Sequence, residues 1–336
     1  MSTATSQTRS VSSHNSGAAT AAHKANTTLL LLAFACVYII WGSTYLAIRV
    51  GDESFPPLIV AGLRHLIFGA LFYPFLRWKT GIRPTKEHWR TAIITGFLLL
   101  FIGNGGVCIA ETTLPSGMAA LLVATVSLWM VLVDWLRPGG TRPVVRVLFG
   151  ILLGFAGVAL LVGPKHLGGS ERISPSGVAI LVVASFAWAC GSLYSKHGAL
   201  PSNPLMGAAM QGLCGGIILW TASFFTGELH TLSLATVSTR SWLAIAYLVF
   251  FGSMMGFTAY VYVLKNSTAT RVATYALVNP VVALLLGWLF AGEAVTQRTL
   301  LATAVILAAV LLVITAPQRQ VARAATTRAT PEAAEA

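Results

Sequence analysis

Two charged residues within apolar stretches are the first candidates for chemistry. Arg64 interrupts the apolar segment 58–76, and Glu111 ends the apolar segment 91–111. If these segments span a membrane, each charge costs about 2.5–3.5 kcal/mol on insertion scales, so a partner or a function must compensate for it. We expect Glu111 to pair with Arg64, and Arg49 to lie on the same face. Two interpretations remain open: an outer gate or a site for a carboxylate, and a structural ion pair.

The dipeptide Asn279-Pro280 lies in the middle of the apolar segment 270–290. Proline removes one backbone donor and clashes with the preceding turn, which leaves a carbonyl free. A free carbonyl at membrane depth is tolerated only beside a cavity or another helix. We therefore predict a hinge at Pro280 and a ligand contact at Asn279, with a simple packing kink as the alternative.

Further polar and aromatic side chains in the apolar segments could line a cavity. Aromatic walls with a few polar groups suit amphipathic small molecules, although interhelical hydrogen bonding or packing is the simpler explanation for any single residue. The predicted substrate-binding residues are Trp41, Ser43, Tyr45, Arg64, Asn104, Glu111, Trp188, Tyr194, Tyr275 and Asn279.

The sequence predicts no metal site and no cofactor. Its four cysteines all lie within apolar runs, without a CxxC pattern or a nearby histidine partner, and are interpreted as small buried hydrophobic residues. It also contains no GxxxxGK[ST] phosphate-binding loop, which excludes ATP-driven work by this chain alone.

The composition explains where these residues must lie. Of the 336 residues, 56% are hydrophobic and only 10% are charged, whereas soluble domains carry about 25% charged residues. An ordinary soluble enzyme is therefore excluded. The net charge of +12 comes without a basic helix or stripe, so no nucleic-acid partner is predicted.

The hydropathy pattern predicts an all-α polytopic membrane protein with ten transmembrane helices. A span needs about 20 apolar residues, and nine charge-free windows of 18 or more residues occur, with 58–76 as a tenth segment. Long uninterrupted apolar runs contradict the alternating strands of a transmembrane barrel. The predicted helices are 29–49, 58–76, 91–111, 116–136, 144–163, 175–195, 204–226, 241–264, 270–290 and 297–315.

Basic residues predict the orientation of these helices. With the N-terminus in the cytoplasm, the cytoplasmic segments hold sixteen Lys and Arg residues and the outer loops hold four. Cytoplasmic loops carry the excess of Lys and Arg, so both termini are predicted to lie inside. The same charges favour anionic membrane lipid as a partner. The ends of the chain, 1–28 and 316–336, are too polar or too low in complexity to bury a core and are predicted to be disordered.

Two short matches indicate an internal repeat. The sequence GSTY at 42–45 matches GSLY at 191–194 with an offset of 149, and WL followed by Gly at 135–139 matches 288–292 with an offset of 153. These matches divide the chain into five-helix halves, 29–163 and 175–315. Because five is odd, the second half is inverted relative to the first. Inverted repeats are typical of secondary transporters, which hold substrate near the midplane between the halves.

At these same residues the chain resembles a known family. The segments concerned are WGSTYLAIRVGDESFPPLIVAGLR (41–64), ETTLPSGMAALLVATV (111–126), SFAWACGSLY (185–194), FGSMMGFTAY (251–260), NPVVALLLG (279–287) and GE (292–293). They resemble the EamA branch of the drug/metabolite transporter superfamily, and most closely its inner-membrane members. The resemblance implies ten helices, a central cavity closed alternately on each side, and export of amino acids or small metabolites. Such proteins commonly have a proline in the fourth helix that matches Pro280, but Ser127 stands there in this chain. The resemblance therefore does not predict a matching bend in the first half.

The resulting prediction is a multi-pass plasma-membrane secondary transporter for a small-molecule substrate, and not an enzyme. The alternative is a membrane-embedded enzyme acting on lipid-linked substrates, which needs clustered acids, histidines or metal ligands at a membrane face. The histidines of this chain are scattered over both faces. A channel needs a repeated filter or a ring of charges, and the sequence shows neither.

Overall fold

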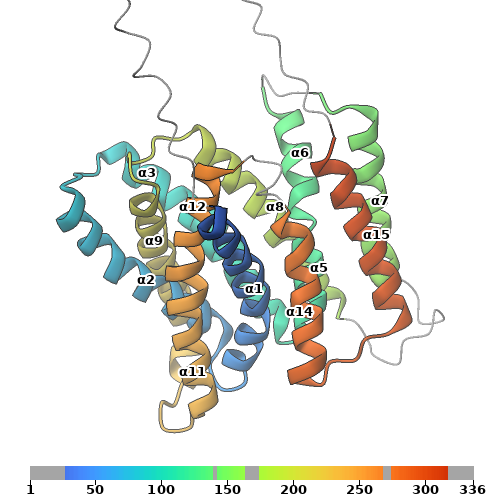
Figure 1. The fold of residues 1–336 in the computed structure, drawn as a ribbon. Helices are drawn as coiled ribbons and strands as arrows, with labels where there is room; N and C mark the ends of the chain where they lie inside the picture. The colour runs from blue at the N-terminus through green and yellow to red at the C-terminus, as the bar shows by residue number, and fades with distance from the viewer. Residues whose placement is uncertain (1–26, 139–141, 163–173, 268–273, 317–336) are drawn as a thin grey trace, which may run out of the picture.

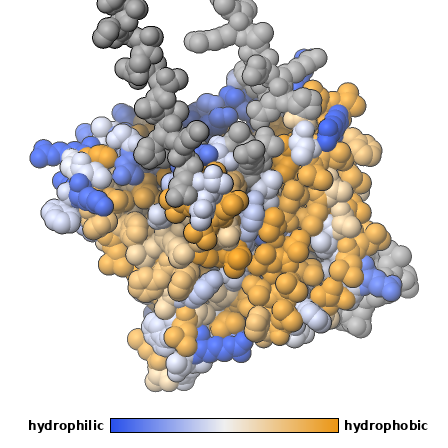
Figure 2. Space-filling model, in the orientation of Figure 1, coloured by the Kyte–Doolittle hydropathy of each residue, from blue (hydrophilic) through white to orange (hydrophobic). Residues whose placement is uncertain are grey.

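The computed structural model describes residues 27–138, 142–162, 174–267 and 274–316, and every regular element within them is a helix (Figure 1). Eight of these helices are long and apolar enough to cross a membrane, and two shorter apolar helices accompany them, Val145–Leu160 and Tyr275–Ala291. Hydrophobic side chains cover the middle of the face shown in Figure 2, and hydrophilic ones gather toward its ends. The prediction of an all-helical polytopic membrane protein is confirmed.

The first part of the chain forms five helical segments. They are α1 (Thr27–Asp52), α2 (Pro57–Thr80), the continuous rod of α3 (Lys86–Thr95), η1 (Gly96–Asn104) and α4 (Gly105–Glu111), the pair α5 (Ser116–Val123) and α6 (Val126–Leu136), and α7 (Val145–Val162).

The second part of the chain follows the same order. Its elements are α8 (Pro175–His197), α9 (Pro204–Phe225), the single turn α10 (Glu228–Thr231), the continuous rod of α11 (Thr239–Tyr247), η3 (Leu248–Met255) and α12 (Gly256–Asn266), then α14 (Tyr275–Ala291) and α15 (Gln297–Ile314). The predicted tails, apart from residues 27, 28 and 316, and the predicted helix start at 270 lie outside the described residues.

Local sequence signals explain most helix ends. The hydroxyls of Ser174, Ser238 and Thr296 each accept a hydrogen bond from the backbone amide three residues later, as N-cap residues do. α2, α8 and α9 have proline in the first turn, where its missing N–H costs nothing. Gly81 and Gly292 end α2 and α14 with positive φ, a conformation that favours glycine.

Two features differ from the predicted helices. The third span begins at Lys86, five residues before the predicted start, because Thr85 and His88 cap α3 reciprocally. The fourth is interrupted at Ala124 and Thr125, although it contains no proline. There the Thr125 hydroxyl donates to Leu122 O at 2.6 Å, and the Leu128 amide donates to Thr125 O at 2.9 Å. This tight i to i+3 turn separates α5 from α6 without a proline.

Glycines allow the helices to approach closely. α2 packs along α9, where a Cβ on Gly69 would collide with the backbone of Leu213 and one on Gly216 would lie 2.5 Å from Leu66 N. α7 packs along α15 at the other side of the bundle (Figure 1). Small residues at such contacts are typical of helix packing in membranes.

Candidate functional site

A charged pocket lies at the C-terminal end of α1. It has a volume of about 360 Å³ and is named here the Arg49 pocket. Residues of α1, α4, α11 and α14, with Glu53 after α1 and Thr112 after α4, surround it. Its lining consists of Arg49, Val50, Asp52, Glu53, Glu111, Thr112, Arg240, Phe290 and Ala291. Five of these nine residues are ionisable, which is unusual for the end of an apolar bundle and indicates a polar entrance.

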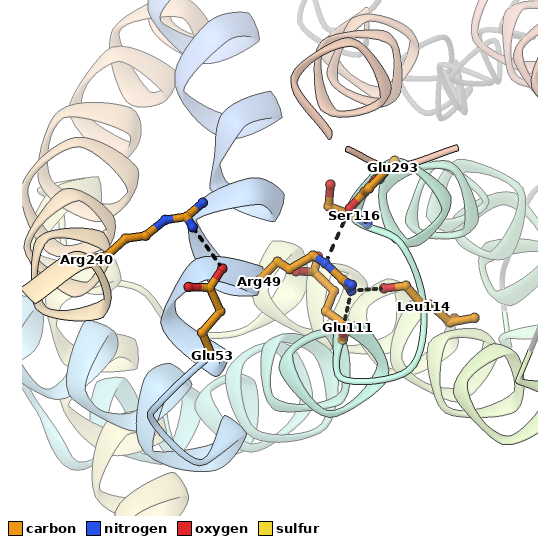
Figure 3. Close-up of polar contacts among 8 residues, drawn as sticks. Arg49, Glu53, Glu111, Leu114, Ser116, Arg240 and Glu293 are labelled. Carbon is orange, nitrogen blue, oxygen red and sulfur yellow. Dashed lines mark hydrogen bonds and ion pairs between the residues drawn. The ribbon is translucent and has the colours of Figure 1, made fainter. Parts of the chain in front are cut away.

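Arg49 joins three parts of the chain at this pocket (Figure 3). Its Nη1 donates to Glu111 O at 3.0 Å and to Leu114 O at 3.1 Å, and its Nε lies 3.6 Å from Glu293 Oε1. Glu293 follows α14 and accepts hydrogen bonds from the backbone amides of Ser116, at 2.7 Å, and Gly117. We call this set the Arg49–Glu293 clasp. It fastens α1, the α4–α5 turn and the end of α14 together.

A second connection joins α1 to α11 across the same pocket. Arg240 Nη1 lies 3.4 Å from Glu53 Oε1, with both side chains about half exposed (Figure 3). The Ser241 hydroxyl donates to Val50 O at 2.8 Å. Because exposed ion pairs contribute little free energy, the Ser241 hydrogen bond is the firmer of the two contacts.

Glu228, in α10, caps the start of α2 in a similar way. The backbone amides of Leu58 and Ile59 donate to its two carboxylate oxygens at 3.4 and 3.2 Å. Partial burial raises the pKa of Glu228 above its ordinary value, although the two amide hydrogen bonds act in the opposite direction. Both this cap and the Glu293 cap therefore place a carboxylate from the second part of the chain on a helix N-terminus of the first.

Arg64 and Glu111 are both buried, but the predicted ion pair between them is wrong. Arg64 is 6% exposed, and its Nε donates instead to the Ser253 hydroxyl of η3 at 3.1 Å. Glu111 is 1% exposed, and neither of its carboxylate oxygens has a hydrogen-bond partner among the described residues. Tyr45 lies within electrostatic range of both. The arrangement is thus a buried guanidinium group and a buried carboxyl group without direct contact between them, and Glu111 also lines the Arg49 pocket.

An aromatic cluster encloses Trp41. Its ring centroid lies 5.0 Å from that of Tyr260 and 5.5 Å from that of Tyr275, and Phe257 lies on another side at 5.7 Å. The indole Nε1 donates to Gly252 O at 3.2 Å. Two predicted residues, Trp41 and Tyr275, are therefore brought into contact by α1, α12 and α14.

Polar contacts also tie α1 to its neighbours near this cluster. With its amide nitrogen toward α1, Asn279 donates to Tyr38 O at 3.3 Å and to Tyr275 O at 3.2 Å. Asn279 and Pro280 are both buried within α14. Ser43 shares a 2.6 Å hydrogen bond with the Tyr247 hydroxyl of α11. The Asn279–Tyr38 and Ser43–Tyr247 contacts link the first part of the chain to the second, whereas the Asn279–Tyr275 contact lies within α14.

The remaining predicted residues lie in two further places. Trp188 of α8 packs on Gly103 of η1, where an added Cβ would lie 2.8 Å from the indole ring. The neighbouring Asn104 interacts with the buried His65, which follows Arg64 in α2. Tyr194 lies in the last turn of α8, where the carbonyl of its own backbone accepts from Gly198. It is therefore separated along α8 from Trp188 by about a turn and a half.

Sequence reasoning missed Glu293, Ser253 and Tyr247. The GE pair at 292–293 was the one available signal for Glu293, because a glycine that ends a helix places the next side chain at the helix terminus. Nothing in the spacing of Ser253 or Tyr247 marks them as partners of Arg64 and Ser43.

Comparison with known proteins decides the family. The family model described as "EamA-like transporter family" matches residues 28–163 and 175–315. The chain belongs to this family. It is 40% identical over 278 residues to the "Uncharacterized inner membrane transporter YedA" of Escherichia coli (strain K12), a match that covers 82% of this chain and 88% of the relative.

Two further matches are more distant. The chain is 27% identical over 285 residues to the "Probable amino-acid metabolite efflux pump" of the same strain, covering 81% of this chain and 90% of that relative. A crystal structure with 18% identity superimposes with a TM-score of 0.57 and covers 85% of this chain and 96% of its own, which supports the fold. The chain is a multi-pass inner-membrane transporter, and the predicted family, membrane location and transport activity are confirmed.

Proposed function

We propose that this EamA-family transporter exports amino acids or related small metabolites by alternating access through a cavity between the halves 29–163 and 175–315. The observation that carries the proposal is the Arg49–Glu293 clasp, which joins the two halves beside the buried Arg64 and Glu111. Alternating access requires that one membrane face of the cavity be closed while the other is open. A contact that holds the two halves together at one face would close it there. The relative named as an amino-acid metabolite efflux pump supports the substrate class.

The two halves are proposed to be inverted repeats of five spans each, with α7 and α14 as the short ones. The π-helical segments support this arrangement. η1 begins at Gly96 and η3 at Leu248, an offset of 152 (248 minus 96) that lies between the two offsets of the sequence matches. The packing has the same symmetry, since α1 packs on the η3-containing rod and α14, and α8 packs on the η1-containing rod and the α5–α6 pair.

Both termini are proposed to be cytoplasmic. The first residue of α1 and the last of α15 lie toward the same end of the bundle in Figure 1, as an even number of crossings requires. That end also carries the loop between α2 and α3, with Arg83 and Lys86. The positive-inside rule gives this end to the cytoplasm, so the Arg49 pocket faces outward.

Within this proposal Arg64 binds the carboxylate of the substrate and Glu111 binds its ammonium group. The hydrogen bond that Arg64 Nε donates to the Ser253 hydroxyl fixes the guanidinium group beside η3 and leaves both Nη atoms as donors for a carboxylate. The predicted lining is completed by Trp41, Ser43, Tyr45, Asn104, Trp188, Tyr275 and Asn279, with Tyr194 at the cytoplasmic mouth and Pro280 as the hinge.

An efflux assay tests the function. The purified protein is reconstituted into liposomes loaded with a mixture of the standard amino acids, and release is followed by mass spectrometry. We expect release of a subset of them, strongly reduced by Arg64→Gln and unchanged by Arg240→Gln, whose ion pair is exposed. If liposomes with the wild-type protein release no amino acid faster than protein-free liposomes do, the proposed substrate class is wrong.

A further inference from the structure

α2 presents an exposed apolar stripe to the surroundings of the bundle. Leu71, Phe75 and Trp78 are 50, 47 and 83% exposed, and Pro74 is exposed between them. Positions spaced by three and four residues lie on one face of a helix. α2 lies at the left edge of the bundle in Figure 1, where no other helix covers its outer side. In a membrane this stripe faces acyl chains.

The stripe ends in a basic pocket at the C-terminal end of α2. The pocket has a volume of about 470 Å³ and is lined by Tyr73, Pro74, Arg77, Trp78, Gly81 and Arg83. Pro74 and Trp78 belong to both the stripe and the pocket, so the two surfaces are continuous. Gly81, with φ of 65°, ends the helix, and Arg83 after it lines the pocket together with Arg77.

The pocket is held in shape by neighbouring side chains. Arg77 Nη1 donates to the Tyr73 hydroxyl at 3.4 Å, and the Tyr73 ring packs edge-on against Trp89 of α3 at 5.2 Å. Thus one wall of the pocket rests on α3, which also packs on α9. Arg77 and Arg83 are exposed and keep donors available for a ligand.

The charge around the pocket is strongly positive. Between residues 77 and 90 the chain has Arg77, Lys79, Arg83, Lys86 and Arg90, with Glu87 as the single acid. Hydrophilic side chains gather over this corner, at the upper left of Figure 2. The negative end of the α2 dipole works against an anion here, so the arginine side chains must supply the attraction.

We propose that this pocket binds one anionic phospholipid, with the phosphate between Arg77 and Arg83 and an acyl chain along Leu71, Pro74 and Phe75. Guanidinium groups bind phosphate oxygens through parallel hydrogen bonds, and an exposed tryptophan suits the level of the headgroups. The apolar stripe that continues from the pocket favours a lipid over a soluble phosphate, which would gain nothing from it. This site is separate from the proposed substrate cavity.

Native mass spectrometry of the purified full-length protein tests this proposal without a transport assay. Phosphatidylglycerol or phosphatidylcholine is titrated in, and the fraction of protein carrying lipid is measured. We expect wild type to prefer phosphatidylglycerol. Arg77→Gln with Arg83→Gln should weaken that binding about twenty-five-fold, because each basic side chain near a membrane surface contributes about fivefold. The matched control, Lys86→Gln with Arg90→Gln, removes the same charge and should weaken binding clearly less, because neither side chain lines the pocket.

Three outcomes would overturn the proposal. Equal binding of phosphatidylglycerol and phosphatidylcholine by the wild type would show that the pocket does not select an anionic lipid. Equal losses in the two double variants would mean that only general positive charge attracts the lipid. If soluble glycerol phosphate displaces phosphatidylglycerol at a similar concentration, the pocket binds the phosphate alone and the acyl chain contributes nothing. Size-exclusion profiles of all variants show whether each is folded.

Discussion

Glu293 Oε1 accepts a 2.7 Å hydrogen bond from the backbone amide of Ser116, which joins the end of α14 to the start of α5. The second carboxylate oxygen accepts from Gly117 at 3.2 Å, and Arg49 of α1 approaches the same carboxylate. A carboxylate on a helix N-terminus satisfies amides that have no partner inside the helix and opposes the helix dipole. One side chain therefore fastens three helices.

The first prediction concerns this cap. Glu293→Gln removes the charge that holds both the α5 amides and Arg49, and should lower the free energy of unfolding by about 1–2 kcal/mol. Thermal unfolding in detergent measures this loss of stability. In the efflux assay, the variant should release amino acids faster than the wild type does, because the outer face is held closed less firmly. Glu53→Gln is the matched control, since it removes a carboxylate from an exposed ion pair in the same pocket. A similar loss in both variants would show that Glu293 has no special role.

Much of the fold could be predicted because apolar runs long enough to span a membrane are separated by recognisable capping residues. The start of α8 at Ser174 and Pro175 is an example. The π-helical segments could not be predicted, because their residues are as apolar as those of the adjoining α-helices. Their course depends on packing, such as that of Leu99 against Gly191 and of Trp188 against Gly103.

The second prediction concerns Pro280. Pro280→Ala restores a backbone donor to a buried helix, so we expect the free energy of unfolding to stay the same or rise by up to about 1 kcal/mol. Efflux should nevertheless fall several-fold if α14 bends at Pro280 during transport. Pro74→Ala is the matched control, because Pro74 also lies inside a helix but is exposed. Wild-type efflux in Pro280→Ala, at equal expression, would leave the proline a packing role only.

The third prediction concerns the neighbouring amide. Asn279→Ala removes the donors to Tyr38 O and Tyr275 O, and should lower the free energy of unfolding by about 1 kcal/mol. Asn279→Asp should be more harmful, because a carboxylate cannot donate to either carbonyl and would be buried beside them. Thermal unfolding of the two variants checks this order, and a more stable Asn279→Asp would contradict the contact.

The candidate site was harder to predict than the fold, because the position of a residue along a helix does not determine the direction in which its side chain points. Arg64 and Glu111 occupy similar depths, yet Arg64 turns to Ser253 of η3. Arg49 reaches the Glu111 segment through backbone carbonyls, which no pattern of side-chain charges reveals. Trp41 and Tyr275 do meet, because α1 packs along α14 and the two rings lie on the facing sides of these helices.

The fourth prediction concerns the orientation of the chain. In a background without its four native cysteines, single cysteines replacing Lys86 and Ser202 should react only when a membrane-impermeant reagent reaches the cytoplasmic face. Cysteines replacing Glu53 and Ser233 should react from the outside of intact cells. All four positions are exposed or half-buried, so access to the reagent is decided by sidedness. If the cysteines that replace Glu53 and Lys86 are labelled from the same side of the membrane, the ten-span arrangement is wrong.

The fifth prediction tests Arg64 as the carboxylate-binding residue. Arg64→Lys keeps the positive charge but has a single nitrogen, which cannot donate to Ser253 and also bind a carboxylate with a planar fork. Losing a hydrogen bond to a charged group costs about 1.5–3 kcal/mol, so efflux should fall about tenfold to a hundredfold. Ser253→Ala should cause a smaller loss, since it frees the guanidinium without removing it. Thermal unfolding separates this effect from damage to the fold, because a purely structural Arg64 would lose stability and efflux together. If Arg64→Lys unfolds like the wild type and still exports at the wild-type rate, Arg64 does not bind the substrate.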